Sequence, residues 1–385
     1  MKVVVQVKLM PTSEEAAALE ATLRTVNRAA DHTSATAFAT GKTSRNDLQR
    51  EVYSALKAEF GLSAQAAVRT VKKVVDAYAT LRANIKAGNL GPPGTKRRRK
   101  AESKPIAFRL DAAQPYDDRI LSWQHDAATV SIWTTAGRIK GVRYTGHPDH
   151  LKTLREYRKG ESDLVHRDGK WFLVAVCEVP EEPRFEPVDW IGVDRGIANL
   201  ATTSDGTNYQ GRRLGRYRRH HARKRAELQA KMTHSAKRRA RRRARKEQRH
   251  AANQNHKISK EIVAIAQRTG RGIAVEDLGS IRDRVRPRRD QRAMLSSWPF
   301  RQLEEHLRYK ARRAGVPVIA VDARYTSQRC PRCGHTERAN RRTRDHFCCR
   351  RCGLAGPADH VAGVNVRNRA RSAWVLVNGP VPQRT

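Results

Sequence analysis

The chain has 385 residues, 38% of them hydrophobic, and 78 Lys and Arg against 38 Asp and Glu give a formal net charge of +40. This length allows two or three domains, and the lack of a run of about 18 apolar residues excludes a membrane-spanning helix. The charge predicts a polyanionic partner. We favour nucleic acid over an anionic membrane, because the basic residues are spread widely and no amphipathic helix carries Trp or Leu on one face.

Residues 2–9 (KVVVQVKL) predict a strand, which Pro11 terminates. Segment 11–90 predicts a helical domain, because Thr12 and Glu15 form a capping-box pattern and apolar residues then recur at three- and four-residue spacing. The predicted helical domain therefore follows a single strand.

A breaker at residues 91–94 (GPPG) precedes a basic run and marks the end of the helical segment. The pattern then changes to short strands, with Asp168 and Gly169 as the turn of a hairpin. We expect segments 1–10 and 91–187 to form one β-barrel domain with the helical domain inserted into it.

The second half of the chain predicts an α/β domain made of segments 188–326 and 357–370. Buried-type strands end in Asp194 and Glu276, and a short last helix opens near Asp359.

Another helix is expected to begin at Ser297, Trp298 and Pro299 and to end at Gly315. Residues 371–385 predict a flexible tail. The predicted fold class is thus α+β and multidomain.

Three carboxylates, Asp194, Glu276 and Asp359, each lie at the end of a predicted element. In an RNase H-like fold, the first strand, the fourth strand and a C-terminal helix bring three such groups to one edge of the sheet. Clustered acids repel one another unless divalent cations neutralise them, and two Mg²⁺ ions can then activate water against a phosphodiester. Asp277, beside Glu276, is either a supporting group or a cap.

Six cysteines in a chain without a secretory signal pattern indicate metal binding in a reducing compartment instead of disulfides. Two Cys-x-x-Cys pairs, separated by fifteen residues, match a zinc ribbon over residues 327–356. Gly334 and Gly353 allow the tight turn after each pair. The four predicted ligands of one structural Zn²⁺ are Cys330, Cys333, Cys349 and Cys352.

Other candidate zinc ligands remain open. Cys348 is an alternative to Cys349 at poorer spacing, and Cys177 in an apolar strand predicts a core residue. Weaker ligand candidates are His335, His346 and His360.

Residues 211–250 contain eighteen Lys or Arg against two Glu, Glu227 and Glu247. A solvated helix face would mix the signs of its charges, so this segment favours contact with phosphates. Such contacts carry no base specificity. Base pairing between the target and a guide RNA can supply that specificity, while the protein holds the paired strands by their shape and charge.

Together these motifs resemble the TnpB family, transposon-encoded RNA-guided RuvC nucleases ancestral to the type V CRISPR effectors. Asp194 in IGVDRGIANLATTSDG resembles the first RuvC motif and Glu276 in GIAVEDL the second. The segment TSQRCPRCG, with FCCRRCG and Ala358-Asp359-His360, resembles the zinc ribbon and the third RuvC motif. One departure is Val361-Ala362-Gly363, where the family often has Asn followed by small residues.

The resemblance implies a β-barrel wedge domain (1–10 and 91–187) with an inserted recognition domain (11–90). It implies a RuvC nuclease domain in the second half, with Asp194, Glu276 and Asp359 as catalytic Mg²⁺ ligands. The implied activity is cleavage of DNA matched to a guide RNA, next to a short adjacent motif. The implied partners are guide RNA and double- and single-stranded target DNA, in the cytoplasm of a prokaryote.

Other functions are weighed against this one. A guide-dependent DNA-binding repressor would be free to lose one of the three acids. A DNA transposase would need recognition of DNA ends, for which no helix-turn-helix is evident. A zinc-ribbon transcription factor leaves the order of the carboxylates unexplained.

Overall fold

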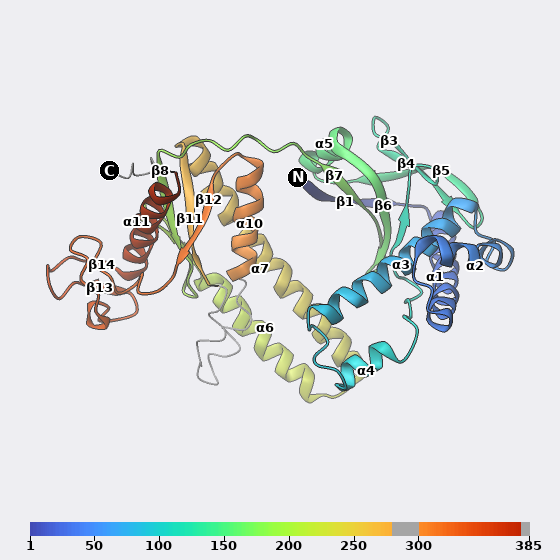
Figure 1. Ribbon diagram of the computed structural model, residues 1–385, viewed down its shortest axis with the longest axis horizontal. Coiled ribbons are helices and arrows are strands. Elements are labelled where there is room, and N and C mark those ends of the chain that lie inside the picture. Colours follow the sequence, from blue (N-terminus) through green and yellow to red (C-terminus); the bar gives the residue numbers. More distant parts are fainter. Residues whose placement is uncertain (279–299, 379–385) are drawn as a thin grey trace, which may run out of the picture. The chain divides into compact units, whose positions relative to one another are not determined.

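The computed structural model describes residues 1–278 and 300–378 (Figure 1). The chain divides into two compact units, Met1–Val179 and Pro180–Thr385. Within the described ranges, no helix is both long enough and apolar enough to cross a membrane. The predicted helix start at Ser297, Trp298 and Pro299 lies outside the described residues.

The first unit contains a seven-stranded sheet with the order β2-β6-β7-β1-β5-β4-β3. Its strands are β1 (Lys2–Met10), β2 (Gln114–Tyr116), β3 (Leu121–Gln124), β4 (Thr129–Thr134), β5 (Gly137–Thr145), β6 (Arg158–Arg167) and β7 (Lys170–Glu178). β1 pairs antiparallel with β5 and β7, which confirms that the opening strand joins the β-rich region. The sheet is nearly closed, since the hydroxyl of Tyr116 in β2 donates to the carbonyl of Trp133 in β4 at 3.3 Å.

The helices of this unit are α1 (Ser13–Thr40), α2 (Arg45–Ala58), α3 (Ala64–Lys86), α4 (Lys96–Glu102) and α5 (Pro148–Tyr157). α1 begins with the predicted capping box, in which Thr12 and Glu15 each accept the other's backbone N–H. The apolar faces of α1, α2, α3 and α5 and of the sheet share one core. The sequence pattern missed α5, which Pro148 starts and which buries Leu154.

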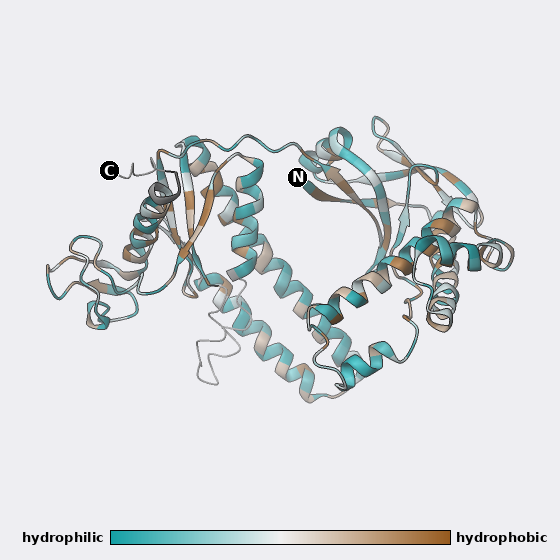
Figure 2. Ribbon diagram, in the orientation of Figure 1, coloured by the Kyte–Doolittle hydropathy of each residue, from teal (hydrophilic) through white to brown (hydrophobic). Residues whose placement is uncertain are grey.

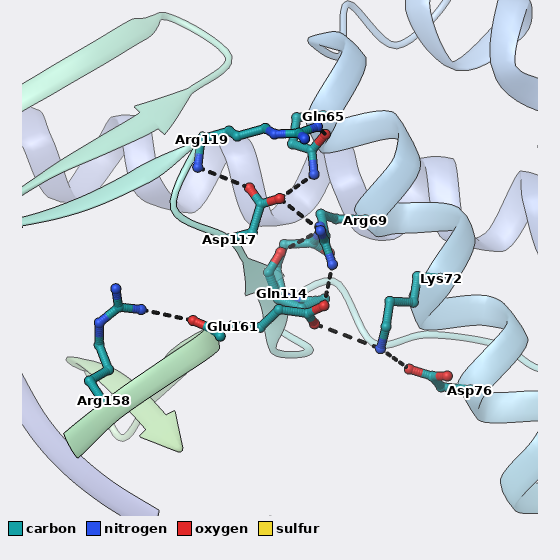
Figure 3. Close-up of polar contacts among 11 residues, drawn as sticks. Gln65, Arg69, Lys72, Asp76, Gln114, Asp117, Arg119, Arg158 and Glu161 are labelled. Atoms are coloured by element: carbon teal, nitrogen blue, oxygen red, sulfur yellow. Dashed lines mark hydrogen bonds and ion pairs between the residues drawn. The ribbon is translucent and has the colours of Figure 1, made fainter. Parts of the chain in front are cut away.

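Arg69 of α3 ties the helices to the sheet (Figure 3). Its guanidinium pairs with Asp117, just after β2, at 2.7 Å and with Glu161 of β6. The Arg69 side chain is only 14% exposed. Because a half-satisfied buried charge is costly, this pairing holds α3 in one position on the sheet.

The second unit contains a five-stranded sheet with the order β10-β9-β8-β11-β12. Its strands are β8 (Asp189–Asp194), β9 (Asn199–Thr203), β10 (Asn208–Gln210), β11 (Arg271–Asp277) and β12 (Val318–Asp322). β8, β9 and β10 are antiparallel neighbours, whereas β11 runs parallel to both β8 and β12. Consecutive residues of β8, β9 and β11 are buried, so both faces of this sheet are covered.

Helices cover both faces of this sheet (Figure 1). Ile191 and Val275 pack in a core with α7 (His234–Arg268) and α10 (Phe300–Arg313). Trp190 and Ala274 pack instead with α11 (Ala358–Asn378). Because successive strand residues face opposite sides, the even-numbered residues of β8 and β11 face α11.

α11 corrects the expectation of a short last helix with a flexible tail from Arg371. It runs to Asn378. Ala370 is buried in the core with Trp190, and the ring of Trp374 lies 5.2 Å from that of Trp190. These apolar contacts stabilise a helix that sequence periodicity did not reveal.

Two glycines let α11 pack directly on β8. A Cβ on Gly192 would lie 2.0 Å from the carbonyl oxygen of Gly363, and one on Gly363 would lie 3.1 Å from the nitrogen of Ser204. The backbone of the helix therefore contacts the backbone of the sheet, so Gly363, noted above as a departure, has a packing role here.

The basic segment forms a helical hairpin of α6 (Arg212–Ala230) and α7. Both helices are largely hydrophilic (Figure 2). Two short strands, β13 (His346–Cys348) and β14 (Ala355–Pro357), and the turn η1 (Arg338–Asn340) complete the unit.

Candidate functional site

The three predicted carboxylates come together on the α11 side of the second sheet. Asp194 ends β8, and Glu276 follows Val275, the residue paired with Val193. Both acids are even-numbered and so face α11, where Asp359 lies in the first turn. The parallel register and the packing of α11 thus place acids from three elements at one end of the sheet.

Glu276 is buried and Asp194 is half-buried, and their carboxyl groups are hydrogen-bonded to each other. Burial, with the charges of Glu276 and Asp359, holds the pKa of Asp194 well above its usual range. Burial also raises the pKa of Glu276, although Thr326 and Arg195 oppose the shift. Such a pair needs a proton or a cation between its oxygens, so the donor set fits a hard divalent ion.

Glu276 is held by two further side chains. The Thr326 hydroxyl donates to its carboxylate at 2.5 Å. Arg195 donates to the carbonyl of Glu276 and pairs with Glu304 of α10 at 2.9 Å. These contacts fix both the backbone and the side chain of Glu276.

Asp359 is held by two side chains as well. Asn199, at the start of β9, donates from Nδ2 to one carboxylate oxygen at 2.8 Å. Arg341, just after η1, reaches the other oxygen at 3.3 Å, and its positive charge partly opposes the rise in the pKa of Asp194. A cation from the Cys-rich segment thus contacts the third acid.

These supporting residues were missed by the sequence analysis. Arg195 and Asn199 lie in the quoted IGVDRGIANL segment and Thr326 opens TSQRCPRCG, but nothing in spacing alone says which partner each one meets. Arg341 carries no local signal, because it lies in a run of basic residues.

A pocket of about 960 Å³ adjoins Asp359. Its wall combines Asn199 of β9 with one face of α6, including Arg218 and Arg225, and with Arg344. Arg225 also pairs with Glu247 of α7 at 2.6 Å. Arginines therefore line part of the pocket, which also reaches one of the three acids.

The four predicted cysteines cluster. Their four sulfur atoms all lie within 4.8 Å of one another. In the described part of the chain, no other group of three or more possible metal-ligand side chains is as compact, and the three carboxylates are more widely spaced. The sulfurs of Cys330 and Cys352 are 3.5 Å apart, and those of Cys333 and Cys349 are 3.6 Å apart. Tetrahedral Zn–S bonds of about 2.3 Å would separate sulfurs by about 3.8 Å.

The turns after each cysteine pair have the expected form. The N–H of Gly334 donates to the carbonyl of Cys330, and that of Gly353 to Cys349, both at 3.0 Å. Both glycines have positive φ, 75° and 71°. The donor set and its turns fit one Zn²⁺ in a zinc ribbon.

The other candidates lie outside this cluster. Cys348 lies in β13, and Cys177 is a core residue of β7, as predicted. His335 contacts Glu337 at 3.0 Å, and His360 contacts the carbonyl of Ser204 at 3.1 Å. His346 is exposed in β13, and Asp277 is exposed at the end of β11.

The α6–α7 hairpin exposes most of its Lys and Arg side chains. Glu227 pairs with Lys224 at 2.8 Å, and Glu247 pairs with Arg225. The two acids within residues 211–250 therefore pair with neighbouring cations, and the exposed Lys and Arg side chains leave a positive surface.

Family models match two parts of the chain. A model described as "Probable transposase" (OrfB_IS605) matches residues 174–280, and one described as "Cas12f1-like, TNB domain" matches residues 300–366. A TnpB-like protein of Methanocaldococcus jannaschii is 32% identical over 126 residues, 32% of this chain and 45% of that protein. The resemblance to TnpB proteins is confirmed.

Two other relatives are nucleases by name. The CRISPR-associated endodeoxyribonuclease Cas12f1 of Sulfoacidibacillus thermotolerans is 41% identical over 113 residues, 29% of this chain and 25% of that protein. The "Putative RNA-guided DNA endonuclease InsQ" of Escherichia coli (strain K12) is 27% identical over 215 residues, 50% of this chain and 52% of that protein. The chain thus spans a quarter to about half of the length of these relatives.

Proposed function

We propose that the protein is an RNA-guided DNA endonuclease of a transposable element, cleaving DNA at Asp194, Glu276 and Asp359. The observation that carries the proposal is the convergence of these acids from β8, β11 and α11, with the pKa of Asp194 raised by burial and by its two neighbours. The strand order β10-β9-β8-β11-β12 supports an RNase H-like, RuvC-type domain. The names of the TnpB-like and InsQ relatives support the guided class.

The three acids would hold Mg²⁺, two ions by the resemblance. Bound there, Mg²⁺ would lower the pKa of a water molecule and stabilise the charge of a phosphodiester's leaving oxygen. Asn199 and Arg341 keep the Asp359 carboxylate oriented, and Thr326 does the same for Glu276. Orientation matters because a misplacement of about 1 Å can reduce the rate about 100-fold.

The remaining residues would bind nucleic acid. The arginines of the pocket beside Asp359 would contact the phosphates of a DNA strand, and the α6–α7 hairpin suits phosphates of a guide–target duplex. The Cys₄ cluster would hold a structural Zn²⁺, which keeps Arg341 beside Asp359. In the first unit we assign the strands to a wedge domain and α1–α3 to a recognition domain.

Two other functions use the same parts. A repressor would bind guide RNA and DNA without cleavage, and a transposase would join DNA strands. The hydrogen-bonded carboxyl groups of Asp194 and Glu276 favour cleavage over simple binding, because burying unneutralised acids costs stability and serves no binding role.

The proposal is tested by expressing the protein with its native flanking DNA, purifying it in high salt and sequencing the bound RNA. One discrete RNA, constant at one end and variable at the other, is expected. The complex should then cut DNA matched to the variable end in Mg²⁺ but not in EDTA. Heterogeneous RNA would contradict the guided class, and binding without cutting would favour the repressor.

A further inference from the structure

Tyr325 lies in the turn after β12 with a backbone conformation that suits glycine. Its φ is +59°, and the residue is 61% exposed. A left-handed conformation is unfavourable for residues with a Cβ and especially for bulky ones. A large aromatic side chain at this position therefore needs an explanation.

The turn is imposed by its neighbours and not by the tyrosine ring. Asn365 of α11 donates from Nδ2 to the carbonyls of Thr326 and Arg329, both at 2.7 Å. Arg369 of α11 donates to the carbonyls of Asp322 and Arg324. No side-chain hydrogen bond or ring contact joins Tyr325 to the part of the chain that the structure describes, so the ring adds little to folding.

The turn is directly beside the proposed cleavage site. Thr326 follows Tyr325, is buried and donates its hydroxyl to Glu276. Because neighbouring Cα atoms are about 3.8 Å apart, the backbone of Tyr325 lies one residue from the side chain that holds Glu276. Strained residues are concentrated at functional sites, and an exposed strained residue next to Glu276 fits that pattern.

We propose that Tyr325 stacks on a nucleobase of the DNA strand that enters the site, and so holds that strand beside the three acids. Proteins hold single strands by stacking bases on aromatic rings and by placing cations near the phosphates. Arg324, the preceding residue in the same turn, is also exposed and offers a cation for a phosphate of that strand. This positioning role rests on the proposed nuclease function.

Three variants of the full-length, RNA-loaded protein distinguish the effect of losing the aromatic ring from the effect of relieving the backbone strain. Tyr325→Phe keeps the ring, and Tyr325→Gly removes it while relieving the backbone. Met232→Gly is the matched control, since Met232 is 76% exposed with φ +53° in the α6–α7 turn. Both glycine variants should melt at or above the temperature of the unaltered protein.

In cleavage of matched DNA, Tyr325→Gly should raise KM about tenfold or more with kcat nearly unchanged. Tyr325→Phe and Met232→Gly should keep the original KM. An unchanged KM in Tyr325→Gly, or an equal defect in Tyr325→Phe, would overturn the stacking role.

A second readout does not require cleavage. In an Asp194→Ala background, a single strand containing 2-aminopurine should lose fluorescence on binding, and Tyr325→Gly should abolish that quenching. Quenching that persists would contradict the inference. If the unaltered protein cut no DNA, the proposed nuclease function would be wrong. The fluorescence quenching would still show whether Tyr325 stacks on a base.

Discussion

Replacing Gly192 with Ala tests how the fold builds the site. The new Cβ would lie 2.0 Å from the carbonyl oxygen of Gly363 and 2.5 Å from the nitrogen of Arg367, both backbone atoms of α11. Real Cβ atoms essentially never approach within 3.0 Å, so the helix must move by about 1 Å. Asp359 moves with it, away from Asp194 and Glu276.

The magnitudes follow from this displacement. Overpacking of a core typically costs about 1–3 kcal/mol, which lowers the melting temperature by roughly 2–12 °C for a unit of this size. A misplacement of about 1 Å at a reacting group can cost about 100-fold in rate. Gly192→Ala should therefore lose far more activity than its loss of stability explains.

Thermal melting and single-turnover cleavage by the RNA-loaded protein measure both effects. Gly215→Ala in α6 is the matched control for stability, because its Cβ would meet nothing within 4 Å. That change should raise the free energy of unfolding by about 0.5–1 kcal/mol. If Gly192→Ala melted and cleaved like the unaltered protein, the direct packing of α11 on β8 would be wrong.

Three further predictions address the other parts of the molecule. Cys330→Ser should release zinc and lower the melting temperature because the site contributes to folding, whereas Cys348→Ser should change neither; equal zinc content in both variants would contradict the assigned ligands. Arg69→Met should destabilise the first unit by about 3 kcal/mol in urea denaturation, since Asp117 and Glu161 lose their shared partner, while exposed Arg82→Met should change it by under about 0.5 kcal/mol. Arg238 and Arg242 are exposed on α7. Replacing both with Ser should reduce the slope of log affinity against log salt concentration for duplex DNA by about 2. An unchanged slope would show that these α7 arginines do not contact phosphates.

Local patterns were sufficient for much of the fold. The capping box at Thr12, the opening strand and the Cys-x-x-Cys turns are each encoded in a few neighbouring residues. The longer α11 was missed because it is stabilised by packing of Trp374 on Trp190, a contact that spans most of the second unit in sequence.

The site was predictable in its acids but not in their support. Asp194 and Glu276 lie at the ends of recognisable strands and Asp359 at the start of a helix, and the order of these elements suggested that the three acids meet. Asn199 and Asp359 are 160 positions apart, and Thr326 and Glu276 are 50 apart. Such pairs depend on strand register and on the Gly192–Gly363 contact, which no short window of sequence contains.

The most direct test of the account is guided cleavage by Asp194→Asn, with Asp277→Asn as the matched control. Asp277 is the exposed carboxylate beside Glu276. The account predicts that Asp194→Asn retains its guide RNA and target binding but cuts no matched DNA in Mg²⁺, while Asp277→Asn still cuts. Cleavage by Asp194→Asn at the rate of the unaltered protein would contradict the assignment of the catalytic site.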